Sequence, residues 1–380
     1  MLPSSRSLHE RRAPAPLVPM RIGILVPGLE PYDAVSNDAI GMVSALQTLG
    51  HETELFAPRS SVAGVTVQPP RAIEAWLRDP DDVLLYHFCV GWDFPLAVLK
   101  RVRARRVLRY HNITPPGFFE GWSPGYVAAC ADGRSQIEAY AKMRCELYLG
   151  DSPFNLEDFL EHGVDPARCA VVPPFHKVEE LVASEPDPRR IPSTNAPLLL
   201  MVGRIAPNKG DLDLIDALAV YRRSSNVDAR LLRVGKLDPN LASYGEAVRR
   251  RAAELDVEAS IVGLPGATIA ELRAAYAAAD SFVMLSSHEG FCVPLVEAMA
   301  LGTPIVAYGS SAIGWTVGDA GLVWDSTDPH LVAASLARLA ADRELRNELR
   351  ERGLTRYRSM YSPDALMRAL SAALVRLERP

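Results

Sequence analysis

The chain has 380 residues, of which 48% are hydrophobic and 23% charged, an ordinary globular mixture. This length exceeds what one hydrophobic core usually organises, so we expect two domains. The formal net charge of −5 argues against a general nucleic-acid-binding protein, because such a protein needs a basic surface to release counterions from phosphates.

Residues 1–19 are rich in proline and arginine but contain no apolar run long enough for a signal peptide, and we expect a disordered leader there. No stretch approaches the ~20 consecutive apolar residues of a membrane span. The five cysteines lack the spacing of a zinc site and are expected to be reduced thiols. These features together predict a cytoplasmic protein.

From residue 20, short apolar runs alternate with segments of helical period, as in βαβ units on a parallel sheet. The predicted strands of a first domain over 20–185 are 21–26, 52–57, 83–87, 106–110, 146–150 and 169–172. Its predicted helices are one capped by Ser36 and ending before Gly50, and others at 95–103, 125–145 and 153–162. Ser152 is expected to cap the last of these helices.

Proline, charged and small polar residues between 173 and 197 indicate a linker. A second domain over 196–361 is predicted to contain strands at 198–202, 230–234, 260–262, 281–285, 304–307 and 322–324. Its predicted helices are 211–222, 241–255, 269–279, with a capping box from Thr268 to Glu271, and one beginning near Pro294. Residues 328–376 are helical by period, and we expect a final helix over about 362–380 to cross back onto the first domain.

The expected fold is therefore α/β, with two Rossmann-like doubly wound domains facing across a cleft. Ligands of such sheets bind at the carboxyl ends of the strands. The most informative stretch there is 286–307, in which a strand ends, a loop presents Glu289 and Gly290, and a helix begins. Free amides at that helix start, those of Phe291, Cys292 and Val293, suit a diphosphate.

A carboxylate beside an anion site is better used to accept hydrogen bonds from hydroxyl groups than to contact phosphate. Glu289 and Glu297 flank the expected anion site, and this arrangement favours a nucleotide sugar as ligand. Residues 201–210 contain a second group of candidate binding residues, in which Gly203 ends a strand and Arg204 and Lys209 follow. Such cations can neutralise a pyrophosphate leaving group.

The first domain offers two further candidates at strand ends. Gly28 and Asp33 lie in the loop after the first strand, and His111 follows the strand at 106–110. A glycine-bearing loop at a first βα turn often contacts ligand. A loop histidine is more often structural, and only its position at the expected cleft favours a role.

The segment H-E-G-F-x-x-P-L-V-E-A-M-A-x-G-T-P-I-V-A resembles the E-x7-E motif of retaining glycosyltransferase family 4, and the similarity extends over about 20–375. The resemblance implies the GT-B fold, with Glu289 binding donor-sugar hydroxyls and Glu297 the ribose diol. It also implies that Arg204 and Lys209 bind the diphosphate, and that His111 lies near the transferred sugar. The base would be bound by backbone around 262–265, including Val262 and Leu264.

Two positions depart from the family pattern. Tyr32 stands where relatives of this type have a glycine in the first loop, which puts close approach of that loop to the diphosphate in doubt. Trp315 replaces a glutamate of the P-E-T-V-G-D-A-G pattern and is expected to alter the wall of the cleft.

The resemblance implies a retaining, metal-independent glycosyltransferase without a cofactor, which moves a sugar from a nucleotide sugar to a glycan, glycolipid or small-molecule acceptor in polysaccharide biosynthesis. No D-x-D motif lies in a suitable loop, since Asp211 and Asp213 start a helix. A nucleotide-sugar epimerase and a non-catalytic nucleotide-sugar-binding protein are the alternatives.

The basic segment 100–106 has two readings. Five of its seven residues are cationic, and they either form a solvated helix end or attach the first domain to an anionic membrane. The second interpretation would place the protein at the inner face of the plasma membrane. On either interpretation we expect no nucleic-acid partner.

Overall fold

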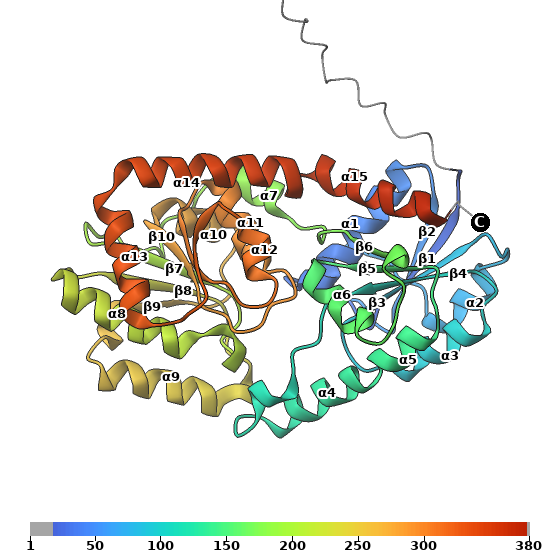
Figure 1. Ribbon diagram of the computed structural model, residues 1–380, viewed down its shortest axis with the longest axis horizontal. Helices are drawn as coiled ribbons and strands as arrows, with labels where there is room; N and C mark the ends of the chain where they lie inside the picture. The colour runs from blue at the N-terminus through green and yellow to red at the C-terminus, as the bar shows by residue number, and fades with distance from the viewer. Residues whose placement is uncertain (1–17, 378–380) are drawn as a thin grey trace, which may run out of the picture.

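A computed structural model describes residues 18–377, so most of the leader predicted over 1–19 lies outside the described residues. The described chain forms two α/β domains that lie side by side (Figure 1). Each contains a six-stranded parallel sheet, with strand orders β2-β1-β3-β4-β5-β6 and β12-β11-β10-β7-β8-β9. The predicted doubly wound α/β fold is confirmed.

The first sheet reads as buried apolar runs because helices cover both of its faces. Its strands are β1 (Arg21–Leu25), β2 (Glu52–Phe56), β3 (Val83–Phe88), β4 (Arg105–Tyr110), β5 (Leu147–Gly150) and β6 (Cys169–Val171). The helices are α1 (Ala34–Thr48), α2 (Ile73–Trp76), α3 (Asp93–Arg101), α4 (Pro124–Ser135), α5 (Ile137–Lys142) and α6 (Pro153–Leu160). The single helix predicted over 125–145 is thus two helices.

The cap of α1 also differs from the prediction. Asp33 is the N-cap, and its carboxylate accepts hydrogen bonds from the Ser36 backbone N–H at 2.8 Å and the Ser36 hydroxyl at 2.7 Å. Ser36 was therefore the wrong cap. Both residues have good capping side chains, so the sequence pattern placed the helix correctly but not its first residue.

The second sheet contains β7 (Leu198–Val202), β8 (Arg230–Val234), β9 (Ile261–Leu264), β10 (Ser281–Met284), β11 (Ile305–Tyr308) and β12 (Gly321–Trp324). Around it lie α7 (Val178–Ala183), α8 (Asp211–Ser225), α9 (Ala242–Glu254), α10 (Ile269–Ala278), α11 (Val293–Leu301), α12 (Ile313–Val317), α13 (Pro329–Ala341) and α14 (Arg343–Arg356). The predicted capping box of α10 is confirmed.

The segment predicted as a linker holds helix α7, which the sequence pattern missed. Val178 and Leu181 of α7 are 1% and 2% exposed and belong to a core shared with α11 and β10. The helix is one and a half turns long, too short to produce a periodic signal. The chain between the domains is thus partly packed structure of the second domain.

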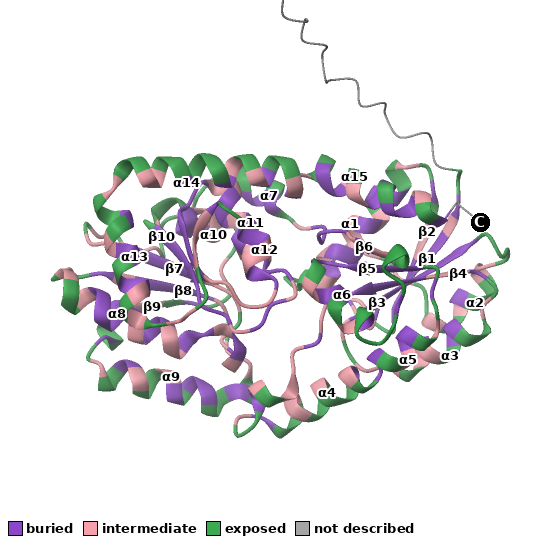
Figure 2. Ribbon diagram, viewed as in Figure 1, coloured by how far each residue is buried: buried purple, intermediate pink, exposed green. Residues whose placement is uncertain are grey.

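The chain returns to the first domain at its end. Ser362 caps α15 (Pro363–Leu374), whose Leu366, Leu370 and Leu374 are buried with β1 and α1 in the core of the first domain. Figure 1 shows α14 and α15 following one another along one side of both domains. Figure 2 shows that the buried residues concentrate in the two sheets and on the helix faces turned toward them. No helix within residues 18–377 is long and apolar enough to cross a membrane.

Candidate active site

The carboxyl edges of the two sheets meet at Gly290. A Cβ atom on Gly290 would lie 2.8 Å from the His111 carbonyl oxygen and 3.0 Å from the Asn112 Cβ, so the approach of the domains here requires glycine. The Ser152 hydroxyl donates to the Gly290 carbonyl at 2.9 Å. Ser152 stands at the N-cap of α6 but makes no side-chain cap bond, contrary to prediction, because its hydroxyl is engaged across the domain boundary.

Lys209 and Glu289 form a close ion pair in the second domain. Their Nζ and Oε1 atoms are 2.6 Å apart, and the two side chains are 17% and 10% exposed. Gly210 brings the two loops together: its φ is +73°, and a Cβ there would lie 2.1 Å from the Leu285 carbonyl oxygen. Asn208 adds a bond to the His288 carbonyl at 3.1 Å. The two sequence motifs therefore meet, because β7 and β10 are neighbours in the second sheet.

The start of α11 lies next to this pair. Its N-cap is Cys292, a buried residue with φ +76°, a left-handed conformation that costs a residue with a Cβ about 1 kcal/mol or more. Phe291 is buried against Trp315 and Tyr361, and its carbonyl accepts a bond from Thr316 at 2.8 Å. Trp315, which replaces a family glutamate, thus supports the loop before α11. Burial raises the pKa of the Cys292 thiol well above its usual value, so that thiol is not a nucleophile.

Glu297 lies one turn into α11, and its side chain contacts α10. The Tyr276 hydroxyl is 2.7 Å from Glu297 Oε2 and 3.1 Å from the Pro294 carbonyl oxygen. Burial raises the pKa of Glu297 to about 7, although the hydrogen bond with Tyr276 lowers it. The carboxyl group of Glu297 therefore changes charge near neutral pH.

Arg204 is exposed, and a buried arginine hydrogen-bonds to its backbone carbonyl. Arg233, which is 5% exposed, pairs with Asp211 at 2.6 Å and donates to the carbonyls of Gly203 at 2.8 Å and Arg204 at 2.9 Å. Arg233 was not predicted to belong to this region, although an arginine between the apolar residues Leu232 and Val234 of β8 was a signal in the sequence. Asp211 forms a buried ion pair rather than only complementing a helix dipole.

The first domain contributes a buried polar cluster around His111. Arg109, fully buried on β4, lies 2.9 Å from Asp38 Oδ2 and 2.8 Å from Asp151 Oδ1. His111 Nδ1 lies 3.0 Å from Asp151 Oδ2, and its Nε2 lies 2.9 Å from His87 Nδ1. Of these five residues only His111 was predicted from the sequence to have a role in the site; Asp38, His87, Arg109 and Asp151 were not.

The two histidines are hydrogen-bonded to each other, and one of them to a carboxylate. A carboxylate only accepts, so His111 donates from Nδ1 to Asp151, and its Nε2 shares a hydrogen bond with His87 Nδ1. Burial lowers the pKa of His87 well below its usual value, and the neighbouring His111 lowers it further, so His87 is neutral. Burial alone would raise the pKa of Asp151, but Arg109 and His111 lower it overall. Both ring nitrogens of His111 are thus engaged inside the domain, and its backbone faces Gly290.

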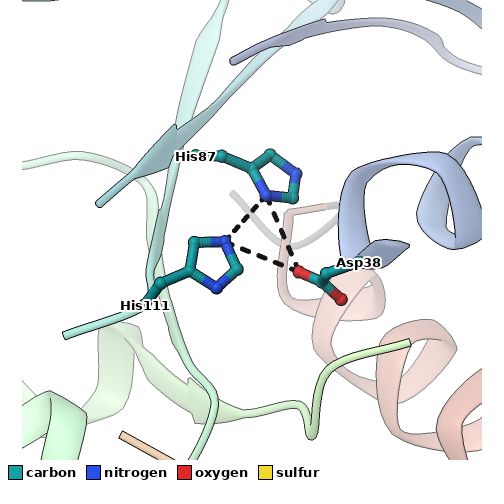
Figure 3. Close-up of side chains that lie close together, drawn as sticks. All are labelled: Asp38, His87 and His111. Atoms are coloured by element: carbon teal, nitrogen blue, oxygen red, sulfur yellow. Dashed lines mark hydrogen bonds and ion pairs between the residues drawn. The ribbon is translucent and has the colours of Figure 1, made fainter. Parts of the chain in front are cut away.

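Asp38, His87 and His111 also have the composition of a metal-binding triad (Figure 3). One donor atom from each lies within 4.8 Å of the others. However, Arg109 donates to the Asp38 oxygen that faces the two imidazoles, and its charge opposes a divalent cation there. We interpret these side chains as a hydrogen-bonded network that holds α1, β3 and β4 together.

The remaining candidates have structural partners. Asp33 is committed to capping α1. Gly28 faces Arg59, with 3.7 Å between a Cβ built on Gly28 and the Arg59 Cγ. Tyr32 takes φ +63°, the conformation suited to the glycine it replaces, and its side chain is exposed. Val262 and Leu264 lie on β9, where Leu264 is buried in the core.

Three of the five cations in the segment 100–106 are paired. Arg101 pairs with Glu74, Arg105 with Asp81, and Arg106 with Glu146. Because Arg105 begins β4 and His111 follows its end, the segment lies at the sheet edge opposite His111. Within the described residues Lys100 and Arg103 form no ion pair.

Two parallel sheets that meet at their carboxyl edges, with a final helix returning to the first domain, define the GT-B architecture. Comparison of structures agrees with this: the sucrose-phosphate synthase of Thermosynechococcus elongatus superposes with a TM-score of 0.70 at 17% identity, over 94% of this chain and 99% of that one. Anabaena Alr3699/HepE in complex with UDP and glucose superposes with a TM-score of 0.70 at 16% identity, over 94% and 99%.

Sequence comparison identifies the family. Residues 184–356 match the profile described as Glycosyl transferases group 1. The GDP-mannose-dependent alpha-(1-6)-phosphatidylinositol monomannoside mannosyltransferase of Mycolicibacterium smegmatis is 31% identical over 339 residues, 83% of this chain and 79% of that protein. The chain belongs to the group 1 glycosyltransferase family. The D-inositol 3-phosphate glycosyltransferase of Corynebacterium glutamicum is 32% identical over 239 residues, 58% of this chain and 57% of that relative's length.

Proposed function

We propose that the protein transfers a sugar from a nucleotide-diphosphate sugar to a glycan, glycolipid or small-molecule acceptor, with retention of anomeric configuration and without a metal ion. The observation that carries the proposal is the meeting of Lys209, Glu289 and the start of α11 inside the segment that matches the family. These groups combine a cation, a hydroxyl acceptor and free amides within one small region.

The proposed donor site follows from these charges. The amides at the start of α11 and the side chain of Lys209 bind the diphosphate, and each charge-assisted bond contributes about 1.5–3 kcal/mol. Glu289 is then released from Lys209 and accepts hydrogen bonds from sugar hydroxyls. Anabaena Alr3699/HepE has been crystallised with UDP-glucose, and the mycobacterial relative is named for GDP-mannose, which supports a nucleotide-sugar donor.

The proposed reaction needs no protein nucleophile. The acceptor oxygen attacks the anomeric carbon as the bond to the diphosphate breaks, and a phosphate oxygen of the leaving group takes the acceptor proton. Arg204 and Lys209 stabilise the charge that develops on the leaving diphosphate, which is the task a metal ion performs in other enzymes. His111 contributes through its backbone, because Asp151 and His87 hold both nitrogens of its ring.

The acceptor is proposed from the relatives alone. Their names include phosphatidylinositol monomannoside and lipopolysaccharide core, which supports a glycolipid or surface polysaccharide as acceptor. Contact of residues 100–106 with an anionic membrane stays a prediction that would depend on Lys100 and Arg103.

A donor panel tests the proposed function. Purified protein is titrated calorimetrically with UDP-, GDP-, ADP- and dTDP-sugars, and the best binder is then tested for release of nucleotide diphosphate with glycan and glycolipid acceptors. We expect one donor to bind, full activity after chelation, and a product whose NMR spectrum retains the donor's anomeric configuration. Failure of every nucleotide sugar to bind would overturn the proposal.

A further inference from the structure

The two domains also meet through an arm formed by residues 116–135, which includes the turn Pro116–Phe119 and α4. Phe119 of this arm is buried together with Ala206, Leu241 and Tyr244 of the second domain. The Trp122 ring packs edge-on against that of Tyr244, with 5.2 Å between ring centroids. Figure 1 shows α4 and α9 next to each other on the side of the molecule opposite α14 and α15. The arm is thus an apolar anchor between the domains.

One polar side chain of the arm reaches the proposed donor site. The Tyr126 hydroxyl donates to Asp238 Oδ2 at 2.7 Å and accepts from Arg204 Nη1 at 3.3 Å. Its ring stacks on Phe119, with 4.8 Å between ring centroids. Asp238 is itself fixed, because it caps the turn at Pro239–Leu241 and accepts from the Asn240 N–H at 2.8 Å.

The position of Arg204 depends on both domains. Arg233 of its own domain holds its backbone carbonyl, whereas within the described residues its guanidinium hydrogen-bonds to Tyr126 alone. A free arginine side chain loses conformational entropy when it is ordered. Tyr126 therefore orders the guanidinium before ligand binds, and it does so only while the arm stays on the second domain.

We propose that Tyr126 is a positioning residue that couples contact between the domains to the orientation of Arg204. The hydroxyl serves as donor to Asp238 and acceptor from Arg204 at once, which a phenylalanine cannot do. When the domains separate, Arg204 loses its partner, so the proposed leaving-group site is complete only in the closed form. This inference rests on the proposed function for the task of Arg204, but the contact itself does not.

The first experiment needs no substrate. Phenylglyoxal modifies accessible guanidinium groups, and mass spectrometry reports its rate at Arg204. Tyr126→Phe keeps the ring on Phe119 and removes the hydroxyl, so we expect modification of Arg204 to become several times faster. The matched control is Ser243→Ala, which removes another hydrogen bond between the domains, from Ser243 to the Trp122 carbonyl at 3.2 Å, without reaching Arg204. Equal rates in wild type and Tyr126→Phe overturn the proposal.

The second experiment uses the donor found by titration. Tyr126→Phe is expected to lower kcat about tenfold with the donor KM changed by less than about threefold, because the lost bond positions Arg204, which acts on charge that develops in the transition state. Tyr126→Phe combined with Arg204→Ala is expected to be no slower than Arg204→Ala alone, and Ser243→Ala is expected to match wild type. Losses that multiply in the double variant overturn the coupling. If the wild type transfers no sugar, the proposed function fails, and the modification rates still decide the role of Tyr126.

Discussion

The second domain builds its share of the candidate site from two short stretches, 203–210 and 289–297, whereas the first domain uses residues scattered from Asp38 to Asp151. In the Lys209–Glu289 pair the Lys209 side chain is 17% exposed, and the proposed function requires the pair to separate when ligand binds. The Arg109 cluster is almost fully buried and bonded internally. On the proposed function, the second domain binds the donor and the first domain supplies a rigid wall opposite it.

The largest expected effect concerns the stability of that wall. Arg109→Met leaves Asp38 and Asp151 buried without their cation, so we expect the free energy of unfolding to fall by about 3–5 kcal/mol. Thermal and urea unfolding measure it. Arg59→Gln, which breaks the exposed pair with Glu30, serves as control and should change stability by less than about 1 kcal/mol. Similar losses in both variants would contradict the rigid role of the cluster.

The next largest effect is expected at the ion pair between Lys209 and Glu289. Lys209→Ala should lower kcat about 100- to 1000-fold, because a cation beside a leaving diphosphate acts most strongly in the transition state. Steady-state kinetics with the identified donor measure the change, and thermal unfolding should show a much smaller loss than Arg109→Met. Near-normal turnover in Lys209→Ala would show that the pair only holds two loops together.

Substitution of Glu289 and of Glu297 tests whether these two residues of the second domain have different roles. Glu289→Gln should impair transfer while leaving affinity for the free nucleotide diphosphate nearly intact, since its proposed partners are sugar hydroxyls. Glu297→Ala should lower the affinity for the nucleotide diphosphate itself by about tenfold, because one or two hydrogen bonds to a charged group are lost. Calorimetric titration separates the two, and an equal loss of nucleotide affinity in both variants contradicts the division of roles.

A pH series tests Glu297 more finely. Burial raises its pKa from 4.5 to about 7, so the carboxyl group is neutral below pH 7 and accepts ribose hydroxyls poorly. Affinity for a nucleotide sugar, whose phosphates do not titrate near neutrality, should fall from pH 8 to pH 6 in wild type and stay flat in Glu297→Gln. Because the folded state retains this proton between pH 4.5 and 7, the group's contribution to stability should decrease as pH rises through that window. An equally steep affinity profile in Glu297→Gln would refute the assignment.

The smallest effect is expected at the basic segment 100–106. With Arg101, Arg105 and Arg106 paired, Lys100 and Arg103 can each contribute about 1 kcal/mol to binding an anionic surface. Flotation with anionic and neutral liposomes at low and high salt measures such binding. Lys100→Gln combined with Arg103→Gln should abolish it, and equal flotation of that variant would exclude these residues.

The site residues of the second domain could be predicted from the sequence more completely than those of the first domain. The strands and most helices were predictable, because buried parallel strands are continuous apolar runs. Lys209 and Glu289 were predictable as site residues because each follows a strand end within a short motif, but their ion pair was not predicted. Arg109 and His87 were not, because a charged residue inside a buried strand reveals its need for partners but not which distant residues supply them. Ser152 illustrates the same limit, since its partner is the Gly290 carbonyl of the other domain.

The return of α15 to the first domain has a consequence for how the chain folds during synthesis. The core of that domain joins β1, near the beginning of the chain, to Leu366, Leu370 and Leu374, near its end. Domains usually fold in the order in which they leave the ribosome. Here the second domain emerges complete while the first still lacks a helix, so the apolar surface that α15 covers stays open to water until residues 363–374 have been synthesised. The second domain is therefore expected to reach its native packing before the first.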